Sequence, residues 1–115
     1  MANTFKVATF AAEPASAGTP YVMYTIAGST TGVVLGLILT NIHSSAVTAE
    51  VELVSTTSNR SVANNTANGT SFLIKDVTIP AGSSLEILSG GKVVLETGDV
   101  LRVDCSVADK LSGTL

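Results

Sequence analysis

Residues 32–42 read GVVLGLILTNI, and residues 47–53 read VTAEVEL. In the second stretch apolar residues alternate with Thr and Glu, which is typical of a strand with one buried face and one face in water. The first stretch is apolar on both faces, which a strand tolerates only where something covers each side. We therefore expect residues 32–42 to form a strand that is central in a sandwich or part of a subunit interface.

The rest of the chain also has the pattern of short strands. No long window has apolar residues at helical spacing, whereas Thr, Val and Ile dominate and clusters of Gly, Pro, Asn and Ser interrupt the chain. The sequence predicts an all-β fold in a single domain without a long helix: an antiparallel β-sandwich of the jelly-roll or immunoglobulin-like type. The expected strands are 4–11, 20–27, 32–42, 46–54, 71–79, 84–88, 92–97 and 100–107, with a last one from about 111.

The C-terminal half is expected to consist of successive hairpins. LEIL (85–88) is predicted to pair with KVVLE (92–96) across the paired glycines of SGG (89–91). In 100–107, Cys105 shares a strand face with apolar residues, so we expect its thiol to be buried and inert. The polar stretch STTSNRSVANNTANGT (55–70) is expected to be an exposed, mobile loop.

The composition argues against several classes of partner. The chain has 115 residues, of which 45% are hydrophobic and only 13% charged, enough for one domain with an aliphatic core. The net charge is −3 and the basic residues are scattered, so we expect no nucleic-acid partner. The longest apolar run, 32–39, is far shorter than the roughly 20 residues of a membrane-spanning helix, so we expect no membrane partner. No signal-peptide core is recognisable near the N-terminus, which favours synthesis in a cytoplasm.

The residues that could carry chemistry favour a protein without catalytic activity. His43 is the only histidine and is interpreted as a turn residue, because a metal site or a triad needs further ligands or a paired nucleophile. Glu50 and Glu52 are interpreted as a solvated strand face, since a glycosidase would want aromatic platforms and only Tyr21 and Tyr24 stand together. We expect no catalytic residues, no metal and no cofactor.

The order of the segments carries a resemblance to a known group of proteins. The stretch YVMYTIAGSTTGVVLGLILTNIHSSAVTAEVEL (21–53) precedes a polar loop, then come PAGSSLE (80–86) and LETGDVLRV (95–103). Over residues 20–110 this order resembles small virion structural proteins of tailed bacteriophages, including those of cyanobacteria. The resemblance implies a β-sandwich subunit of the particle, and it brings no catalytic residues.

These observations together predict a structural function. We expect a capsid decoration or cement protein of a tailed-phage virion, made in the host cytoplasm, that binds the major capsid protein or other virion proteins as a homo-oligomer, with a trimer favoured. A neck or tail protein of the virion and a carbohydrate-binding or adhesin module are the alternatives. A cupin-type enzyme is disfavoured by the single histidine.

The interface is expected to draw on two parts of the chain. Residues 1–19 are predicted to be an N-terminal strand or arm that reaches a neighbour, and residues 20–115 to be the sandwich domain. The expected interface residues are Phe5 and Phe10 in the arm and Val34 and Ile38 in the apolar strand.

Overall fold

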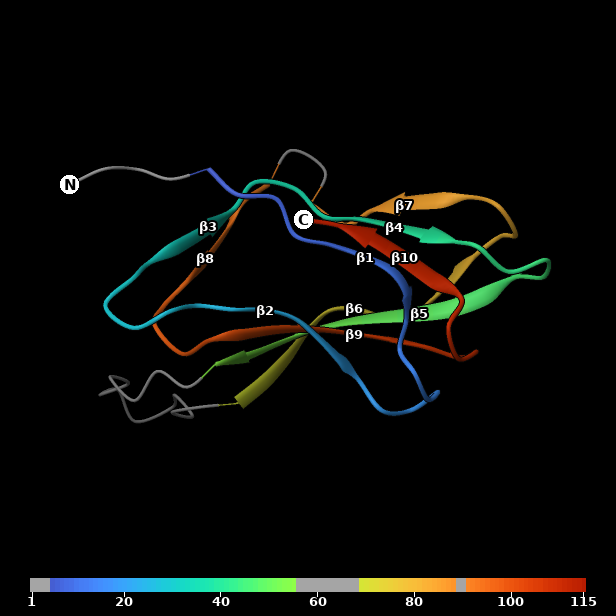
Figure 1. Cartoon of the computed structure of the whole chain (residues 1–115), viewed down its shortest axis with the longest axis horizontal. Coiled ribbons are helices and arrows are strands. Elements are labelled where there is room, and N and C mark those ends of the chain that lie inside the picture. The colour runs from blue at the N-terminus through green and yellow to red at the C-terminus, as the bar shows by residue number, and fades with distance from the viewer. Residues whose placement is uncertain (1–4, 56–68, 89–90) are drawn as a thin grey trace.

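Two four-stranded antiparallel sheets face each other in the computed structural model, which describes residues 5–55, 69–88 and 91–115 (Figure 1). No helix occurs in these ranges. The first sheet has the order β1 (Thr9–Glu13), β10 (Leu111–Thr114), β4 (Ile38–Asn41) and β7 (Ser84–Glu86). The second has the order β2 (Tyr21–Thr25), β9 (Val100–Cys105), β5 (Val47–Ser55) and β6 (Gly69–Ile79). A two-stranded ribbon of β3 (Gly32–Val34) and β8 (Val93–Leu95) leans between the layers at one end. The predicted all-β, single-domain sandwich is confirmed.

The strands pair in a nested order. β5 pairs with β6, β4 with β7, β3 with β8, β2 with β9 and β1 with β10, all antiparallel. The chain is therefore one long hairpin whose turn falls between β5 and β6. Two further pairings, of β4 with β10 and of β5 with β9, join the rolled hairpin into the two four-stranded sheets.

The core between the sheets is aliphatic, because alternate residues of each strand point inward. On β9, Leu101, Val103 and Cys105 are at most 3% exposed, while the residues between them face outward. The inward residues of β5 begin with Val47, Ala49 and Val51. The predicted burial of Cys105 is confirmed, and the alternation expected in both strands is present.

The apolar stretch 32–42 is divided between the ribbon and the first sheet. β3 ends at Val34 and β4 begins at Ile38. Val34 and Leu37 both face the core, although they lie three residues apart, so the period-two alternation is broken between them. Gly36 lies in this break, where a glycine eases a bend of the backbone. The expectation of one continuous strand over 32–42 was wrong.

The hairpin expected between LEIL and KVVLE was also wrong. β7 pairs with β4 and β8 pairs with β3, because the long segment that contains β3 and β4 supplies a partner to each of them. Residues 89–90 of the expected turn lie outside the described residues. So do residues 56–68 of the expected loop 55–70, and the ends of that stretch belong to β5 and β6.

The middle of the N-terminal segment is a strand, β1, which pairs with β10 in the first sheet. Phe10 in β1 is 8% exposed, and its ring packs against the Tyr21 ring with 5.2 Å between centroids. Its cross-strand partner is Gly113, where an added Cβ would collide with the Phe10 ring. The ring thus fills the space that the glycine leaves. Within the described residues, only residues 5–8 precede the strand and could act as an arm.

Asn41 is fully buried at the end of β4 and connects two turns that cross between the sheets. Its Nδ2 donates to the carbonyl oxygens of Ser45 and Ile79, both at 2.9 Å, and its Oδ1 accepts from the main-chain N–H of His43 at 2.8 Å. Its main chain is bonded to residues 82–83. Every polar group of Asn41 therefore has a partner, and residues 42–46 are fixed against residues 79–83. His43 lies in this turn, as predicted.

Replacing Asn41 by Ala is expected to lower the free energy of unfolding by about 2–4 kcal/mol, because the buried carbonyl of Ile79 and the partly buried carbonyl of Ser45 and N–H of His43 lose their partner. Urea denaturation measures the change. Ser45→Ala is the control, since only the main-chain carbonyl of Ser45 accepts from Asn41, and its effect should stay within about 0.5 kcal/mol. Equal losses in the two variants would contradict the assigned role of the amide.

Gly113→Ala is expected to lower the free energy of unfolding by about 1–3 kcal/mol, because the new methyl group overlaps the Phe10 ring. The matched control is Gly32→Ala, where the new Cβ would meet the flexible end of Ile26 and the side chain can move away. Combining Gly113→Ala with Phe10→Leu should cost less than the sum of the single changes in thermal denaturation. Strict additivity would show that the ring is not the obstacle.

Candidate interaction surface

An apolar row runs along the outer side of the segment that contains β3 and β4. Val33, Leu35, Ile38 and Ile42 are between 45% and 58% exposed, and Val94, the cross-strand partner of Val33, is 60% exposed. We call these five residues the apolar spine. A single chain thus leaves one side of its most apolar segment in contact with water.

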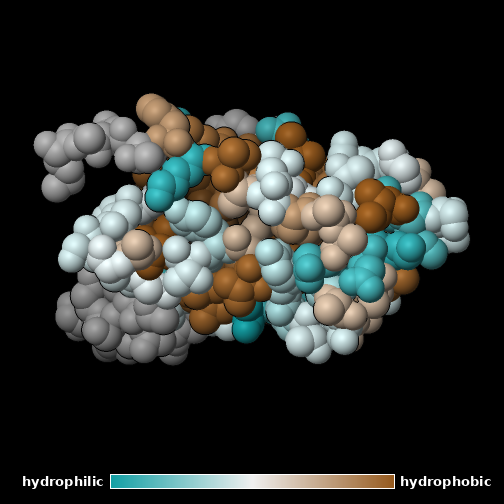
Figure 2. Space-filling view, in the orientation of Figure 1, coloured by the Kyte–Doolittle hydropathy of each residue, from teal (hydrophilic) through white to brown (hydrophobic). Residues whose placement is uncertain are grey.

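The spine exists because both sides of the segment are aliphatic while only one side has a core to face. Val34, Leu37, Leu39 and Asn41 point inward and are at most 6% exposed. Figure 2 shows hydrophobic side chains in brown at several places on this face, among them its upper part. Large apolar side chains that gather on a surface are typical of sites of protein association.

The first sheet continues this surface with small uncharged side chains. The register places one outer row across its four strands, formed by Thr9, Thr114, Ile38 and Glu86. The next row contains Ser112, Thr40 and Ser84. Glu86, on the edge strand, is the one charge in these two rows. A partner could cover this face without desolvating many charges, which is the costly part of burying polar surface.

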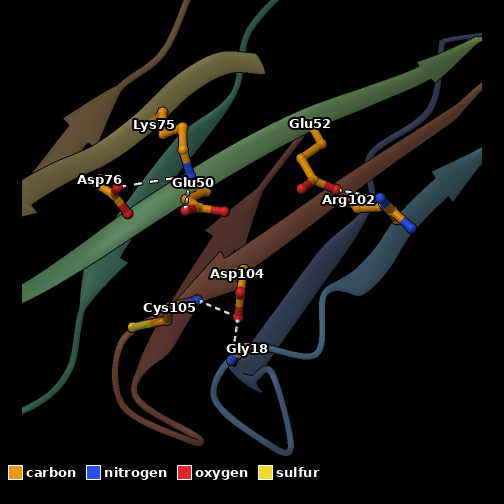
Figure 3. A network of polar contacts seen from close by, with 8 residues as sticks. All are labelled: Gly18, Glu50, Glu52, Lys75, Asp76, Arg102, Asp104 and Cys105. Carbon is orange, nitrogen blue, oxygen red and sulfur yellow. Dashed lines mark hydrogen bonds and ion pairs between the residues drawn. The ribbon is translucent and has the colours of Figure 1, made fainter. Parts of the chain in front are cut away.

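The outer face of the second sheet has the opposite character, because it carries charged side chains, several of which pair within the chain (Figure 3). Arg102 on β9 donates through Nε to Glu52 on β5 at 2.9 Å, and Glu52 is only 7% exposed. Lys75 donates to Glu50 at 2.8 Å and lies 4.6 Å from the centroid of the Phe72 ring. The hydrogen bond to Glu50 raises the pKa of Lys75 above its usual value of 10.5. Glu50 and Glu52 thus share the outer face that was expected, but Glu52 is covered and paired rather than solvated.

A shallow hollow of about 200 Å³ lies beside these charges and is lined by Gly18, Thr48, Glu50, Asp76, Asp104, Cys105 and Ser106. Asp104 Oδ1 accepts from the main-chain N–H groups of Gly18 at 3.1 Å and Cys105 at 2.8 Å. Cys105 lines the hollow, but the residue is only 3% exposed. Among the described residues, no group of three or more His, Cys, Asp or Glu could hold a metal ion.

The two tyrosines belong to the core side of β2. Tyr21 and Tyr24 lie opposite the inward residues Val103 and Leu101, and both pack against the core. Tyr21 also contacts Phe10 in the first sheet. Neither ring stands free on a face as a sugar-binding platform would, which weakens the carbohydrate-binding alternative.

The structure separates the four expected interface residues into two pairs. Phe10 and Val34 are 8% and 6% exposed and belong to the core, so their assignment to an interface was wrong. Phe5 and Ile38 are 85% and 45% exposed and stand on the surface. Sequence reasoning missed the other spine residues, Val33, Leu35, Ile42 and Val94. The usable signal was the alternation within 32–42, but the shift between Val34 and Leu37 decides which residues face outward.

Comparisons with known proteins identified no relative of this chain. No protein-family model matches the chain, and no curated protein or solved structure shows significant similarity to it. In the described part of the chain, no helix is long and apolar enough to span a membrane.

Neighbouring valines of β3 allow a matched test of the spine. Val34→Thr is expected to lower the free energy of unfolding by about 1–3 kcal/mol, because it places a hydroxyl in the core without a partner. Val33→Thr, the same change one residue away on the exposed side, should stay within about 0.5 kcal/mol for the dissociated chain. Urea denaturation at low protein concentration measures both, and a larger loss for Val33→Thr would reverse the assigned directions.

Proposed function

We propose that this chain is a structural subunit of a tailed-phage virion, a capsid decoration or cement protein that acts as a homo-oligomer and catalyses nothing. The observation that carries the proposal is the apolar spine, which lies beside a nearly uncharged sheet face. The resemblance of residues 20–110 to small virion proteins supplies the class of assembly. A neck or tail protein would use the same surface, so the two positions differ in the partner rather than in the chemistry.

The topology supports this assignment. We infer that the sandwich is a jelly roll, because a hairpin with nested pairs is rolled into two four-stranded sheets. Jelly rolls are found in viral capsid proteins, in lectin domains and in cupins. The inward position of Tyr21 and Tyr24 disfavours a lectin-like platform. Cupin chemistry needs several ligands from histidine, and the only histidine, His43, lies in the turn that Asn41 holds.

The spine would act by exchanging contact with water for contact with a partner. Apolar burial stabilises a contact by roughly 25 cal/mol per Å², and a stable contact needs about 800 Å² per partner. The five spine residues supply the apolar centre of such a contact, and the Thr and Ser rows of the first sheet supply its uncharged surroundings. A subunit bound in this way holds its neighbours together by surface complementarity alone, and no chemical step is needed.

Binding to particles tests the proposal directly. Purified chain is added to particles of the phage that encodes it, prepared without this subunit, and bound protein is measured after sedimentation. We expect wild-type chain to bind at regular positions and Leu35→Lys/Ile38→Lys to lose binding, since charges in an apolar contact are costly to desolvate. The position of the added density in a particle reconstruction distinguishes capsid from neck or tail.

Val22→Lys is the matched control, because Val22 is a 49% exposed valine on the outer face of the second sheet. It should bind as the wild type does. Loss of binding in all variants would point to a nonspecific charge effect. Absence of the wild-type chain from purified particles, together with no binding on addition, would refute the virion assignment.

A further inference from the structure

Residues 5–8, which we call the arm, leave the first sheet with their apolar side chains exposed. Phe5 is 85% exposed and Val7 is 71% exposed. Ala8 still exchanges two main-chain hydrogen bonds with Leu115, at 3.2 and 2.8 Å, and no main-chain pairing of residues 5–7 with the rest of the described chain is present. Residues two apart in an extended chain point the same way, so Phe5 and Val7 offer one apolar side. Figure 1 shows this segment along the upper side of the molecule, ahead of β1.

The ribbon of β3 and β8 offers a complementary surface. It is a sheet of two strands, and within the described residues neither strand has a partner on its other edge. Two-stranded sheets are only marginally stable on their own, and a further strand or packing against another element stabilises them. The ribbon's inner side packs on the core through Val34 and Leu95, while its outer side presents the Val33–Val94 pair next to Leu35.

Arm and ribbon lie at the same end of the sandwich, but within one chain the arm leaves the ribbon uncovered, because Phe5, Val7 and Val94 are 85%, 71% and 60% exposed. β1 and β4 are both antiparallel to β10, so they run in the same direction and their preceding segments leave at the same end. β10 lies between them, so a straight continuation of β1 runs about 10 Å from the line of β4, two strand spacings away. That distance is too long for main-chain pairing, and it agrees with the exposure of Phe5 and Val7.

We propose that the arm of one copy docks on the ribbon of a second copy, with Phe5 and Val7 covering Val33, Val94 and Leu35. This rests on the proposed homo-oligomeric function and names the contact that builds the oligomer. The chain itself carries both halves of the contact, an apolar extended segment and an apolar ribbon with unpaired edges. Each copy has one of each, so the contacts close either as a reciprocal pair or as a ring.

Cysteine cross-linking between two differently tagged chains tests the contact. All variants carry Cys105→Ala, which removes the native thiol. Chain with Val7→Cys is mixed with chain carrying Val94→Cys and oxidised mildly, and we expect a mixed disulfide, because docking brings the two Cα atoms to a distance that a disulfide spans. Val22→Cys in place of Val94→Cys is the control, since Val22 is also exposed but lies on the other sheet. It should cross-link several-fold more slowly.

Mass in solution supplies the second readout. Phe5→Asp and Val94→Asp should each shift the protein from an oligomer to the single-chain mass of 11.7 kDa, while Val22→Asp should leave the oligomer intact. Both Asp positions are exposed, so folding is expected to persist, and circular dichroism verifies it.

Three results would overturn the arm contact. These are cross-linking no faster than the Val22→Cys control, a disulfide that forms only within one chain when Val7→Cys and Val94→Cys are combined, and an oligomer that survives Phe5→Asp. Particle binding separates this inference from the proposed function. A chain that binds particles without mixed disulfides refutes the arm alone, whereas a chain that forms them and never enters particles refutes the virion assignment and leaves the arm in place.

Discussion

The buried amide of Asn41 is the constraint on which the arrangement of the two sheets depends. An aliphatic core attracts the sheets to each other, but it is nondirectional and tolerates more than one register. Hydrogen bonds from a buried amide require defined geometry, and a partner left without its bond is expensive. Asn41 holds the turn after β4 against the turn before β7, which are two of the connections where the rolled hairpin crosses between sheets. One side chain therefore ties the two halves of the rolled hairpin together at this pair of turns.

The outer faces of the two sheets carry different kinds of side chain. The second sheet carries charged side chains, and two acid–base pairs, Glu52 with Arg102 and Glu50 with Lys75, form within the chain. The first sheet and the ribbon carry Thr, Ser and the apolar spine. One outer face is thus charged, and the other side carries the exposed apolar spine. Such a protein is suited to bind a larger assembly in a fixed orientation, which is what the proposed virion function requires.

Sequence patterns were sufficient where one strand had one core to face. The alternation of 47–53 and 100–107 predicted the inward residues of β5 and β9, Cys105 among them. Sequence patterns were insufficient for residues 32–42, because this segment contributes one strand to the ribbon and one to the first sheet. Nothing in GVVLGLILTNI determines locally that the chain passes from the ribbon to the first sheet between Val34 and Leu37. This break puts Val34 in the core and Ile38 on the surface, although the two would share a face in one continuous strand. Phe10 was misassigned for a related reason, because the space for its ring is created by Gly113, which is distant in sequence.

The nested pairing of the strands also favours one order in which the strand pairs form during folding. β5 and β6 lie nearest to each other along the chain, and each pair beyond them encloses a longer segment, up to β1 with β10. Closing a long loop costs more conformational entropy than closing a short one, and every inner pair that forms shortens the effective loop for the next. The strand pairs can therefore form in order from the β5–β6 hairpin outward, and β1 is the last strand to pair. If copies of the chain associate as proposed, β1 and the segment before it would pair at the same late stage, so that closure of the roll and assembly would become adjacent steps.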